Sequence, residues 1–480
     1  MQIVKIYLLL KSVHHLNFME NTSSLALLCQ LKEELGSNKF TTEYADLELN
    51  RTDRWHASVS PDCVVYAETV EDVQIVMRFA NKHGIPVTAR GGGVGYVGGC
   101  VPVAGGIALS LARMNRICAI DAADGVAVIE PGVITGDLQA EVRKLGMFYP
   151  PDPASLKECT IGGNVATNAG GPRCLKYGVT RHYILGLEVV LADGRVLRTG
   201  NRCHKNKTGF DLIGMFVGSE GLLGIVTQIT VRLLPHPPSR GMLSCSFQDF
   251  AAAAEAVQGV LRAGHLPSSL EISDQYTLQA ARDHVGSNVI PDGQAHLLVE
   301  LDGQEASVHS ESAQLKALLE SLGGFALDIA TTEEDCERLW DIRRAFSYSL
   351  RATGLAKLNE DIVVPRGRLV ELAKFTEQLQ VETGFQVASF GHAGDGNIHV
   401  NIMVPPLETE EHHAAVDAAL DRLFQQVLAW GGVISGEHGI GLAKKPWFQQ
   451  ALPEVAIDIH QMLKRALDPR GLLNPGKFVS

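Results

Sequence analysis

The sequence lacks several features, and each absence excludes a class of protein. Its nine cysteines include no CxxC pair, and this odd number is typical of reduced thiols, which excludes a disulfide framework and an iron–sulfur cluster on this chain. Lysine and arginine are outnumbered by acidic residues, 42 to 54, and the net charge of −12 disfavours nucleic acid as a partner. No hydrophobic run is long enough to span a bilayer. We therefore expect no transmembrane segment and a cytoplasmic location, with peripheral attachment to the inner membrane as an alternative.

The N-terminal stretch is also a poor targeting signal. Its short apolar run is broken by Lys11 and two histidines, and no small-residue cleavage site follows. We expect residues 1–18 to lie outside the folded protein, with Met19 as a candidate initiator. The remaining chain, in a sequence that is 45% hydrophobic and 20% charged, is long enough for roughly two or three domains.

Two histidine motifs in the second half of the chain predict a metal site. Residues 389–401 read SFGHAGDGNIHVN, and an alternating strand over 398–403 should point His399 and Asn401 from one face, while the glycine-rich turn brings His392 beside them. Residues 435–441 read SGEHGIG and add Glu437 and His438. Two imidazoles, an amide oxygen and a carboxylate suit a divalent ion such as Zn²⁺ or Mn²⁺, and His438 is then left to act as a base. A polar strand face without metal is the alternative.

A glycine-rich loop in the first half resembles a dinucleotide site only superficially. Residues 91–99 read GGGVGYVGG and contain GxGxxG, but they lead through Pro102 into another strand rather than into a crossover helix. This order disfavours a Rossmann domain. The exposed backbone N–H groups can still form an anion nest for a pyrophosphate, with Arg90 nearby, and a flexible linker is the alternative.

The spacing of capping and turn residues predicts several elements. Thr69 and Asp72 predict a capped helix that ends at Gly84, a second capped helix is expected over 135–145, and a hairpin is expected at residues 193–194. A second loop over 150–171 is dense in Gly, Asn, Thr and Ser.

The chain changes character at a proline cluster, residues 235–238, where we place a domain boundary. Beyond it we expect antiparallel strands and long helices, including helices over 331–352 and 405–430.

Together these segments resemble the vanillyl-alcohol oxidase/PCMH flavoprotein superfamily, with an FAD-binding PCMH-type domain and an FAD-linked oxidase C-terminal domain. They look most like the D-2-hydroxyacid dehydrogenase branch, which includes the flavoprotein subunit of glycolate oxidase, FAD-dependent D-lactate dehydrogenase and D-2-hydroxyglutarate dehydrogenase. The two glycine loops, GHAGDGNIHVN, SGEHGIG and the ending LLNPGKF occur in the family's order.

The resemblance implies an α+β fold. A PCMH-type FAD-binding domain of two α/β subdomains is expected over 41–238, after an N-terminal extension and first helix over 1–40. A substrate or cap domain with an antiparallel sheet flanked by helices, holding the metal site, is expected over 239–450. The segment 451–480 is expected to return to the FAD domain.

The resemblance also implies how FAD is held. Covalent members attach the flavin through a histidine, often in the first glycine loop, and this loop has none, so we expect dissociable FAD. The implied pyrophosphate contacts are Arg90, Gly91, Gly92, Gly93, Val94, Gly95, Gly98 and Gly99. The implied contacts with the flavin and ribityl chain are Pro150, Asp152, Pro153, Ser155, Thr160, Gly162, Gly163, Asn164, Thr167, Gly170 and Gly171. The implied contacts at the adenosine end are Glu220, Gly221 and Ile225.

The implied chemistry uses residues of the second half. Arg343 matches an arginine that clamps the substrate carboxylate, which suits the guanidinium fork, with a surface salt bridge as the alternative. Further substrate contacts implied by the resemblance are Ser347 and Lys357. The implied metal ligands are His392, His399, Asn401 and Glu437, with His438 as the catalytic base.

The implied activity is FAD-dependent oxidation of a small D-2-hydroxyacid, of the glycolate, D-lactate or D-2-hydroxyglutarate type, to the 2-oxoacid. It combines metal-assisted proton abstraction with hydride transfer to flavin N5. The electrons would pass to an acceptor protein or a quinone, with an iron–sulfur partner subunit as one option. Three alternatives remain: a non-catalytic flavin-binding subunit of a glycolate oxidase-like complex, an NAD-dependent dehydrogenase, and a metal hydrolase.

Overall fold

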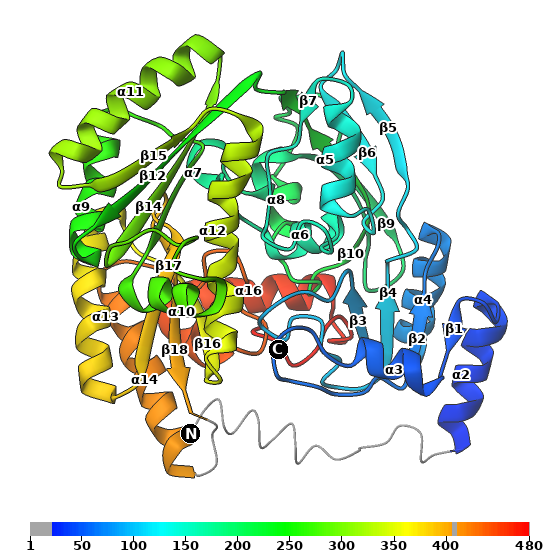
Figure 1. Ribbon diagram of the computed structural model, residues 1–480. Helices are drawn as coiled ribbons and strands as arrows, with labels where there is room; N and C mark the ends of the chain where they lie inside the picture. The colour runs from blue at the N-terminus through cyan, green and yellow to red at the C-terminus, as the bar shows by residue number, and fades with distance from the viewer. Residues whose placement is uncertain (1–21, 406–409, 480) are drawn as a thin grey trace. The chain divides into compact units, whose positions relative to one another are not determined.

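The computed structural model describes residues 22–405 and 410–479 (Figure 1). The extension expected over residues 1–18 and the candidate start at Met19 lie outside the described residues. The described chain divides into two compact units. We call the first the large-sheet unit, which comprises Gly171–Gly178 and Pro237–Gly436. We call the second the glycine-loop unit, which comprises the described residues of 22–170, 179–236 and 437–479.

The large-sheet unit is built on a seven-stranded sheet in the order β15-β12-β14-β13-β17-β18-β16. Every neighbouring pair of its strands is antiparallel. The strands are β12 (Ser239–Phe247), β13 (Ser269–Ser273), β14 (Ala295–Gly303), β15 (Phe325–Ala330), β16 (Ala356–Val363), β17 (Gln386–His392) and β18 (Asn397–Val404). The helices are α7 (Cys174–Tyr177), α9 (Phe250–Arg262), α10 (Gln275–Val285), α11 (Glu305–Ser321), α12 (Glu333–Ala352), η3 (Arg366–Arg368), α13 (Leu369–Thr383) and α14 (Glu410–Ala429).

Helices cover both faces of this sheet (Figure 1). On one face α10 and α12 pack together; Phe346 of α12 contacts Phe390 of β17, and Trp340 belongs to the same buried cluster. Helix α11 lies on the other face. Gly241 of β12 faces this helix, since a methyl group placed on Gly241 would lie 2.9 Å from Val308 of α11. Because side chains alternate along a strand, the face that α12 covers also carries polar residues of β13, β16, β17 and β18.

The glycine-loop unit contains two main sheets. The four-stranded sheet, in the order β1-β2-β4-β3, is parallel except for β1, and the five-stranded sheet, in the order β5-β6-β10-β8-β9, is antiparallel. The strands are β1 (Phe40–Thr41), β2 (Cys63–Tyr66), β3 (Val87–Arg90), β4 (Ile107–Ser110), β5 (Ile117–Asp121), β6 (Val126–Ile129), β7 (Met147–Phe148), β8 (Ile184–Val190), β9 (Val196–Gly200), β10 (Ile225–Arg232) and β11 (Leu234–Pro235). The helices are α2 (Thr22–Leu35), α3 (Tyr44–Asn50), α4 (Val70–His83), α5 (Thr135–Arg143), α6 (Ile161–Thr167), η2 (Thr180–Tyr183), α8 (Leu212–Phe216), α15 (Lys445–Ala451) and α16 (Glu454–Leu467).

The predicted cap of α4 is confirmed. The Thr69 hydroxyl accepts from the backbone N–H of Asp72, the Asp72 carboxylate accepts from that of Thr69, and Gly84 ends the helix in the left-handed conformation at φ 73°. The hairpin predicted at residues 193–194 joins β8 to β9 and is also confirmed.

The predicted cap of α5 is wrong. The residue before this helix is Ile134, which has no side-chain cap bond, and α5 begins at Thr135 itself. The Thr135 hydroxyl is fully buried and accepts a hydrogen bond from Asn164 Nδ2 at 2.7 Å, so it is used in tertiary packing instead.

The predicted long helices of the second half are present. The helix expected over 331–352 is α12, whose N-cap is Thr332, and the helix expected over 405–430 is α14, with residues 406–409 outside the described part. The strand expected over 398–403 is β18. The functional domain boundaries that we assigned at residues 238 and 450 stay predictions.

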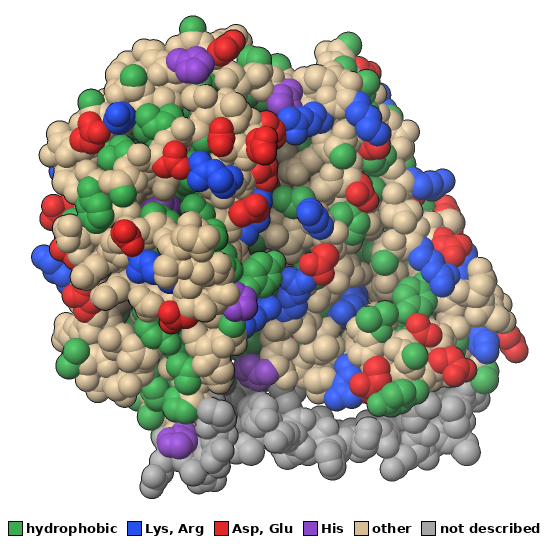
Figure 2. Space-filling model, viewed as in Figure 1, with side chains coloured by type: hydrophobic (Ala, Val, Ile, Leu, Met, Phe, Trp, Pro, Cys, Tyr) green, Lys and Arg blue, Asp and Glu red, His purple; other side chains and the backbone are tan. Residues whose placement is uncertain are grey.

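The surface mixes charges of both signs. Lys and Arg side chains and Asp and Glu side chains occur across the face shown in Figure 2. Among the described residues, none of the helices has both the length and the apolar character needed to cross a bilayer.

Candidate functional site

The two motif histidines meet where β17 pairs with β18. In this register Phe390 lies opposite His399 and His392 opposite Asn397, so the turn between the strands brings both histidines to one end of the sheet face. Their ring centroids are 5.6 Å apart, and a ring nitrogen of each lies within 4.8 Å of the other. The large-sheet unit therefore brings together two of the four predicted metal ligands.

Asn401, a third predicted ligand, lies on the same face of β18 two residues after His399. Its side chain is fully buried, and Nδ2 donates to the backbone oxygens of Ala388 and His399 at 3.0 and 3.1 Å. Its Oδ1 is buried with no hydrogen-bond donor among the described residues. A buried acceptor without a donor is costly, so this oxygen and the two imidazoles fit a divalent cation.

Glu271 of β13 connects one of these histidines to the predicted substrate arginine. It is 1% exposed; its Oε1 lies 2.6 Å from His392 Nδ1 and its Oε2 accepts from Arg343 Nε at 2.6 Å. Burial alone would raise the pKa of Glu271, but while the His392 imidazole is protonated its charge, the Arg343 charge and the hydrogen bonds of both outweigh burial and lower this pKa to about 2. The sequence analysis missed Glu271, although a charged residue in the short strand SLEIS was an available signal.

Arg343 therefore forms a salt bridge, as in the alternative that we kept, but with a buried carboxylate rather than at the surface, and its contact with a substrate carboxylate stays a prediction. Its guanidinium carbon lies 4.7 Å from the ring centroid of Phe390, and its side chain is 14% exposed. The planar group is thus held between Glu271 and an aromatic face.

The two other predicted substrate residues bond to each other beside Arg343. Lys357 of β16 donates from Nζ to the Ser347 hydroxyl at 2.9 Å, and Nζ lies 5.8 Å from the Phe390 ring centroid. Burial, followed by the charges of Arg351 and Arg343, lowers the pKa of Lys357 to about 7. The cluster of Arg343, Ser347 and Lys357 can bind an organic anion.

Asp361 of β16 anchors the start of the SGEHGIG segment. It is fully buried, and its carboxylate accepts from Asn397 Nδ2 at 2.7 Å, from the Gly436 N–H at 2.9 Å and from the Ser435 hydroxyl at 3.1 Å. Consecutive Cα atoms are about 3.8 Å apart, so the predicted ligand Glu437 begins within that distance of the anchored Gly436.

In the glycine-loop unit, the two predicted cofactor loops pack against each other. A side chain at Gly91 would collide with the Thr160 hydroxyl, and one at Gly92 would lie 2.5 Å from the Glu158 backbone oxygen. Gly93 has φ +67° and lies over the Arg90 guanidinium, which donates to the Thr52 backbone oxygen at 2.6 Å. Arg90 thus packs against the backbone of the first glycine loop, and its contact with a pyrophosphate stays a prediction.

Asp53, which the sequence analysis missed, lies under the same loop. Its Oδ1 accepts from the Trp55 N–H at 2.9 Å, and its Oδ2 would lie 3.4 Å from a methyl group on Gly95. Burial raises its pKa to about 6, although backbone hydrogen bonds from Trp55, Gly98 and Gly99 oppose the shift.

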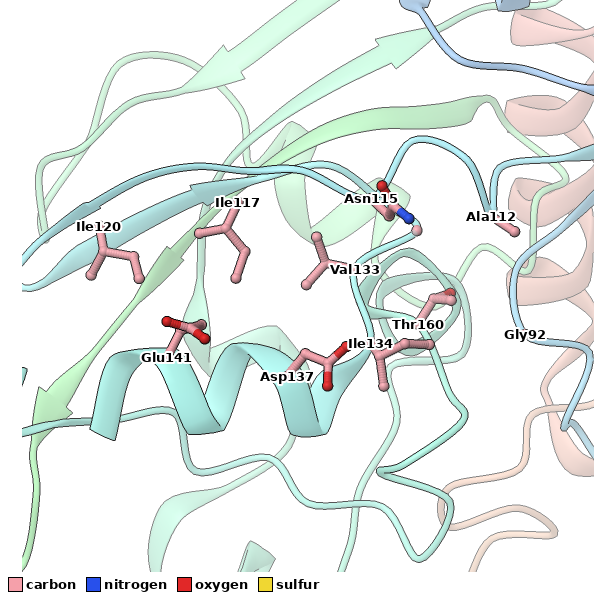
Figure 3. A pocket seen from close by; sticks show the side chains of 11 residues that line it. Gly92, Ala112, Asn115, Ile117, Ile120, Val133, Ile134, Asp137, Glu141 and Thr160 are labelled. Carbon is pink, nitrogen blue, oxygen red and sulfur yellow. The ribbon is translucent and has the colours of Figure 1, made fainter. Parts of the chain in front are cut away.

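A cavity of about 680 Å³ opens between the first loop, α5 and the β5–β6 hairpin (Figure 3). Asp137 and Glu141 of α5 face Ile117 and Ile120 of β5 across it. Its lining residues are Gly92, Ala112, Asn115, Ile117, Ile120, Gly132, Val133, Ile134, Asp137, Glu141 and Thr160. Apolar walls with two carboxylates suit a ligand with a hydrophobic part and with hydroxyl or amino donors. Only two of the predicted cofactor residues, Gly92 and Thr160, line this cavity.

Several other predicted cofactor residues make bonds within the second loop. Thr160 accepts from the Gly163 N–H and caps α6, and the Thr167 hydroxyl donates to the Gly163 backbone oxygen. The close approach of Gly162 to Pro131 leaves no room for a side chain. Direct cofactor contacts of these residues stay predictions.

Glu220 holds the SGEHGIG segment from within the glycine-loop unit. It is a non-glycine residue with φ 50°, and its two carboxylate oxygens accept from the Ile440 and Gly441 N–H groups at 2.7 and 2.8 Å. Burial raises its pKa. The structure therefore gives this carboxylate a loop-anchoring role, and its predicted approach to the adenosine end is untested.

The predicted base His438 lies on this anchored segment. Its ring centroid is 5.2 Å from that of Tyr96 in the first glycine loop, and its Nε2 is 3.9 Å from Glu437 Oε1. Asn474 of the LLNPGKF ending donates to the backbone oxygens of Gly99 and Glu220 at 2.9 and 2.8 Å. The first loop, the base and the chain ending are thus joined in one unit, and the sequence analysis missed both Tyr96 and Asn474.

Two family models match this chain. The model for the FAD binding domain matches residues 61–200, and the model for FAD linked oxidases, C-terminal domain, matches residues 236–478. Among curated proteins, glycolate oxidase subunit GlcD of Bacillus subtilis is 37% identical over 87% of this chain and 89% of its own length. D-lactate dehydrogenase of Anaerostipes hadrus is 34% identical over 88% and 90%, and that of Archaeoglobus fulgidus is 36% identical over 87% and 91%.

Solved structures show the same fold. Substrate-bound p-cresol methylhydroxylase superposes with a TM-score of 0.78 over 94% of this chain and 96% of its own, at 22% identity. A 4-ethylphenol oxidase from Gulosibacter chungangensis gives a TM-score of 0.76 over 95% and 97%, at 20% identity. The expected α+β fold class, with PCMH-type architecture, is confirmed.

Proposed function

Because this chain belongs to the family of FAD linked oxidases, we propose that it oxidises a small 2-hydroxyacid to the corresponding 2-oxoacid. The membership confirms the resemblance expected from the motifs, and it makes the chain an FAD-linked oxidoreductase with an FAD-binding domain. The names of the relatives, glycolate oxidase subunit and D-lactate dehydrogenase, support a substrate of this class.

One observation carries the proposal. The pair His392 and His399 and the cluster of Arg343, Ser347 and Lys357 lie on the same face of the large sheet, around Phe390. A 2-hydroxyacid carries a carboxylate next to a hydroxyl. The cluster of Arg343, Ser347 and Lys357 can bind the carboxylate, and the histidine pair can hold a cation that binds the hydroxyl.

The residues of this chain would divide the work as follows. Arg343 binds the substrate carboxylate, and Ser347 and Lys357 donate to it. His392, His399, Asn401 and Glu437 would hold a divalent ion, and His438 would accept the hydroxyl proton at a ring nitrogen. When bound, FAD supplies the hydride acceptor and the divalent ion supplies Lewis acidity at the hydroxyl.

Electrons must then leave the reduced cofactor. The subunit name of the glycolate oxidase relatives supports a complex with further subunits. We propose that an acceptor protein, an iron–sulfur partner subunit among the options, or a quinone takes the electrons.

An anaerobic absorbance experiment tests this function. The purified protein is mixed in turn with glycolate, D-lactate, L-lactate and D-2-hydroxyglutarate, before and after EDTA. We expect glycolate or one D-acid to bleach the flavin band, EDTA to abolish the bleaching, and Zn²⁺ or Mn²⁺ to restore it. L-lactate is the matched control and should leave the band unchanged.

The variant His438→Asn separates catalysis from cofactor binding. It should remain yellow yet fail to bleach with the active acid, because the proton acceptor is removed while the flavin site is kept. A wild-type protein that is yellow but bleached by none of the four acids would contradict the proposal and favour a non-catalytic flavin-binding subunit.

A further inference from the structure

We propose that Glu271 is a positioning residue that fixes the orientation of both His392, a predicted metal ligand, and Arg343, the predicted substrate arginine. This inference rests on the proposed function. The carboxylate lies between them in space although the three residues are far apart in the chain. Glu271 and His392 are direct neighbours in the pairing of β13 with β17, and Arg343 reaches the same carboxylate from α12.

On the histidine side, the contact determines which nitrogen can bind metal. A carboxylate only accepts hydrogen bonds, so at 2.6 Å from Oε1 the Nδ1 atom of His392 carries the hydrogen. The lone pair of a neutral ring is then on Nε2, the form in which a carboxylate-bound histidine ligates a metal. Oε1 also accepts from the Ser269 hydroxyl at 3.3 Å, which helps to hold the carboxylate in place.

On the arginine side, the hydrogen bond from Arg343 to Glu271 fixes the orientation of the guanidinium. Oε2 takes the Nε hydrogen of Arg343, and Phe390 lies against the plane of the group. This bond holds the guanidinium through its Nε and leaves terminal N–H groups to donate to an anion. Because this carboxylate is 1% exposed and uses one oxygen for each partner, a change at Glu271 must alter both sites at once.

Glutamine cannot replace Glu271 in this arrangement. If its amide NH₂ faces Arg343, two donors oppose each other at the substrate clamp. If its NH₂ faces His392, the Nδ1 atom must accept, and the hydrogen moves to Nε2, where it blocks metal binding. Aspartate keeps two accepting oxygens and should preserve more of both functions.

The chain offers a matched control in Glu300 of β14. This carboxylate is equally buried at 1% exposed and is bonded to Arg173 Nε at 3.1 Å and to Trp340 Nε1 at 2.7 Å. Arg240 Nη1 and the Ser268 hydroxyl also donate to it, at 3.4 and 3.0 Å. All four partners lie in the large-sheet unit, and none is a predicted ligand or clamp. Glu300→Gln therefore measures the general cost of losing a buried charge from the same sheet.

The test uses the full-length FAD-loaded protein as wild type, Glu271→Gln, Glu271→Asp, Glu300→Gln and His392→Ala. Zn²⁺ retention is measured by elemental analysis after dialysis against graded chelator, oxalate affinity by the shift of the flavin spectrum, and folding by thermal unfolding. We expect Glu271→Gln to lose about 10-fold to 100-fold in Zn²⁺ affinity and also to lose oxalate affinity. Glu271→Asp should lose less of both, and Glu300→Gln should match wild type in both.

The outcomes separate this inference from the proposed function. If His392→Ala loses Zn²⁺ while Glu271→Gln keeps wild-type affinity for Zn²⁺ and oxalate, the role of Glu271 is overturned and the proposed metal site stands. It is also overturned if Glu271→Gln and Glu300→Gln lose both ligands equally, or if Glu271→Asp is no better than Glu271→Gln. If wild type and His392→Ala bind Zn²⁺ equally, the metal site of the proposed function fails first.

Discussion

Lys357 is a lysine whose ammonium group is largely withdrawn from water, on a strand that crosses the candidate site. Burial lowers its pKa to about 7, and the nearby charges of Arg351 and Arg343 act in the same direction. Its protonated form is therefore lost within the neutral pH range, whereas the arginines stay charged. A residue of this kind gives anion binding a pH dependence that arginine cannot give.

We expect the affinity for oxalate, a non-oxidisable anion, to fall as pH rises from 6 to 9 through the pKa of Lys357. The sign follows because only the protonated amine attracts the anion. Lys357→Met should weaken binding at pH 6 by roughly 10-fold to 100-fold, the effect of a charged hydrogen bond of about 1.5–3 kcal/mol, and should remove the pH dependence.

Flavin absorbance titrations at each pH measure this affinity. Lys374→Met, at an exposed position of α13, is the control and should behave as wild type. A pH dependence that persists in Lys357→Met would assign it to another group.

At the scale of elements, residues of β16 and β18 hold the start of the segment 435–441, which contains Glu437 and His438. Asp361 of β16 binds Gly436 and Asn397 of β18 at once, so the segment starts from the sheet edge rather than from a free loop. A side chain on Gly436 would collide with Asn397 and lie 2.8 Å from the Asp361 carboxylate. The predicted ligand and base thus depend on a backbone approach that only glycine permits.

Gly436→Ala should lower the rate of flavin reduction by about 100-fold, because displacing a catalytic group by about 1 Å has effects of this size. Bound flavin should be unchanged. Stopped-flow reduction under anaerobic conditions measures the rate. Gly367→Ala in η3 is the control, since a methyl group there meets nothing within 4 Å. Equal rates in the two variants would show that the segment is not held at Gly436.

At the scale of the whole molecule, the cofactor loops are separated in the chain and joined only by folding. The first loop packs on the second through Gly91 and Gly92, and Asn474 near the chain end ties the first loop to Glu220. Between Arg90 and Gly99 no histidine is available to bond the flavin. We predict that these loops hold the cofactor through backbone groups and packing, without a covalent bond.

We therefore expect FAD to be released intact when the whole protein is denatured. Trichloroacetic acid precipitates the chain, and the flavin absorbance should appear entirely in the supernatant. Heat denaturation with separation of the supernatant serves as an independent control. Flavin that remains in the protein pellet after washing would reveal a covalent bond to a residue outside the first loop.

The sequence by itself determined what depends on neighbours along the chain. The capping box at Thr69, the hairpin at residues 193–194 and the strand that carries His399 and Asn401 follow from local spacing and periodicity. The turn chemistry between His392 and His399 likewise predicted that the two would meet. Motif order over nearly the whole chain was sufficient for the family.

Only the tertiary structure decided which distant groups support the site. Glu271 lies 121 residues from His392 and 72 from Arg343, and Glu220 lies 220 residues from Ile440. These contacts depend on the register of β13 against β17 and on the docking of α12 and of the chain ending, which no local pattern encodes. The predicted cap of α5 is wrong for the same reason. Local spacing assigned the Thr135 hydroxyl to the helix, but in the folded chain it accepts a hydrogen bond from the buried Asn164.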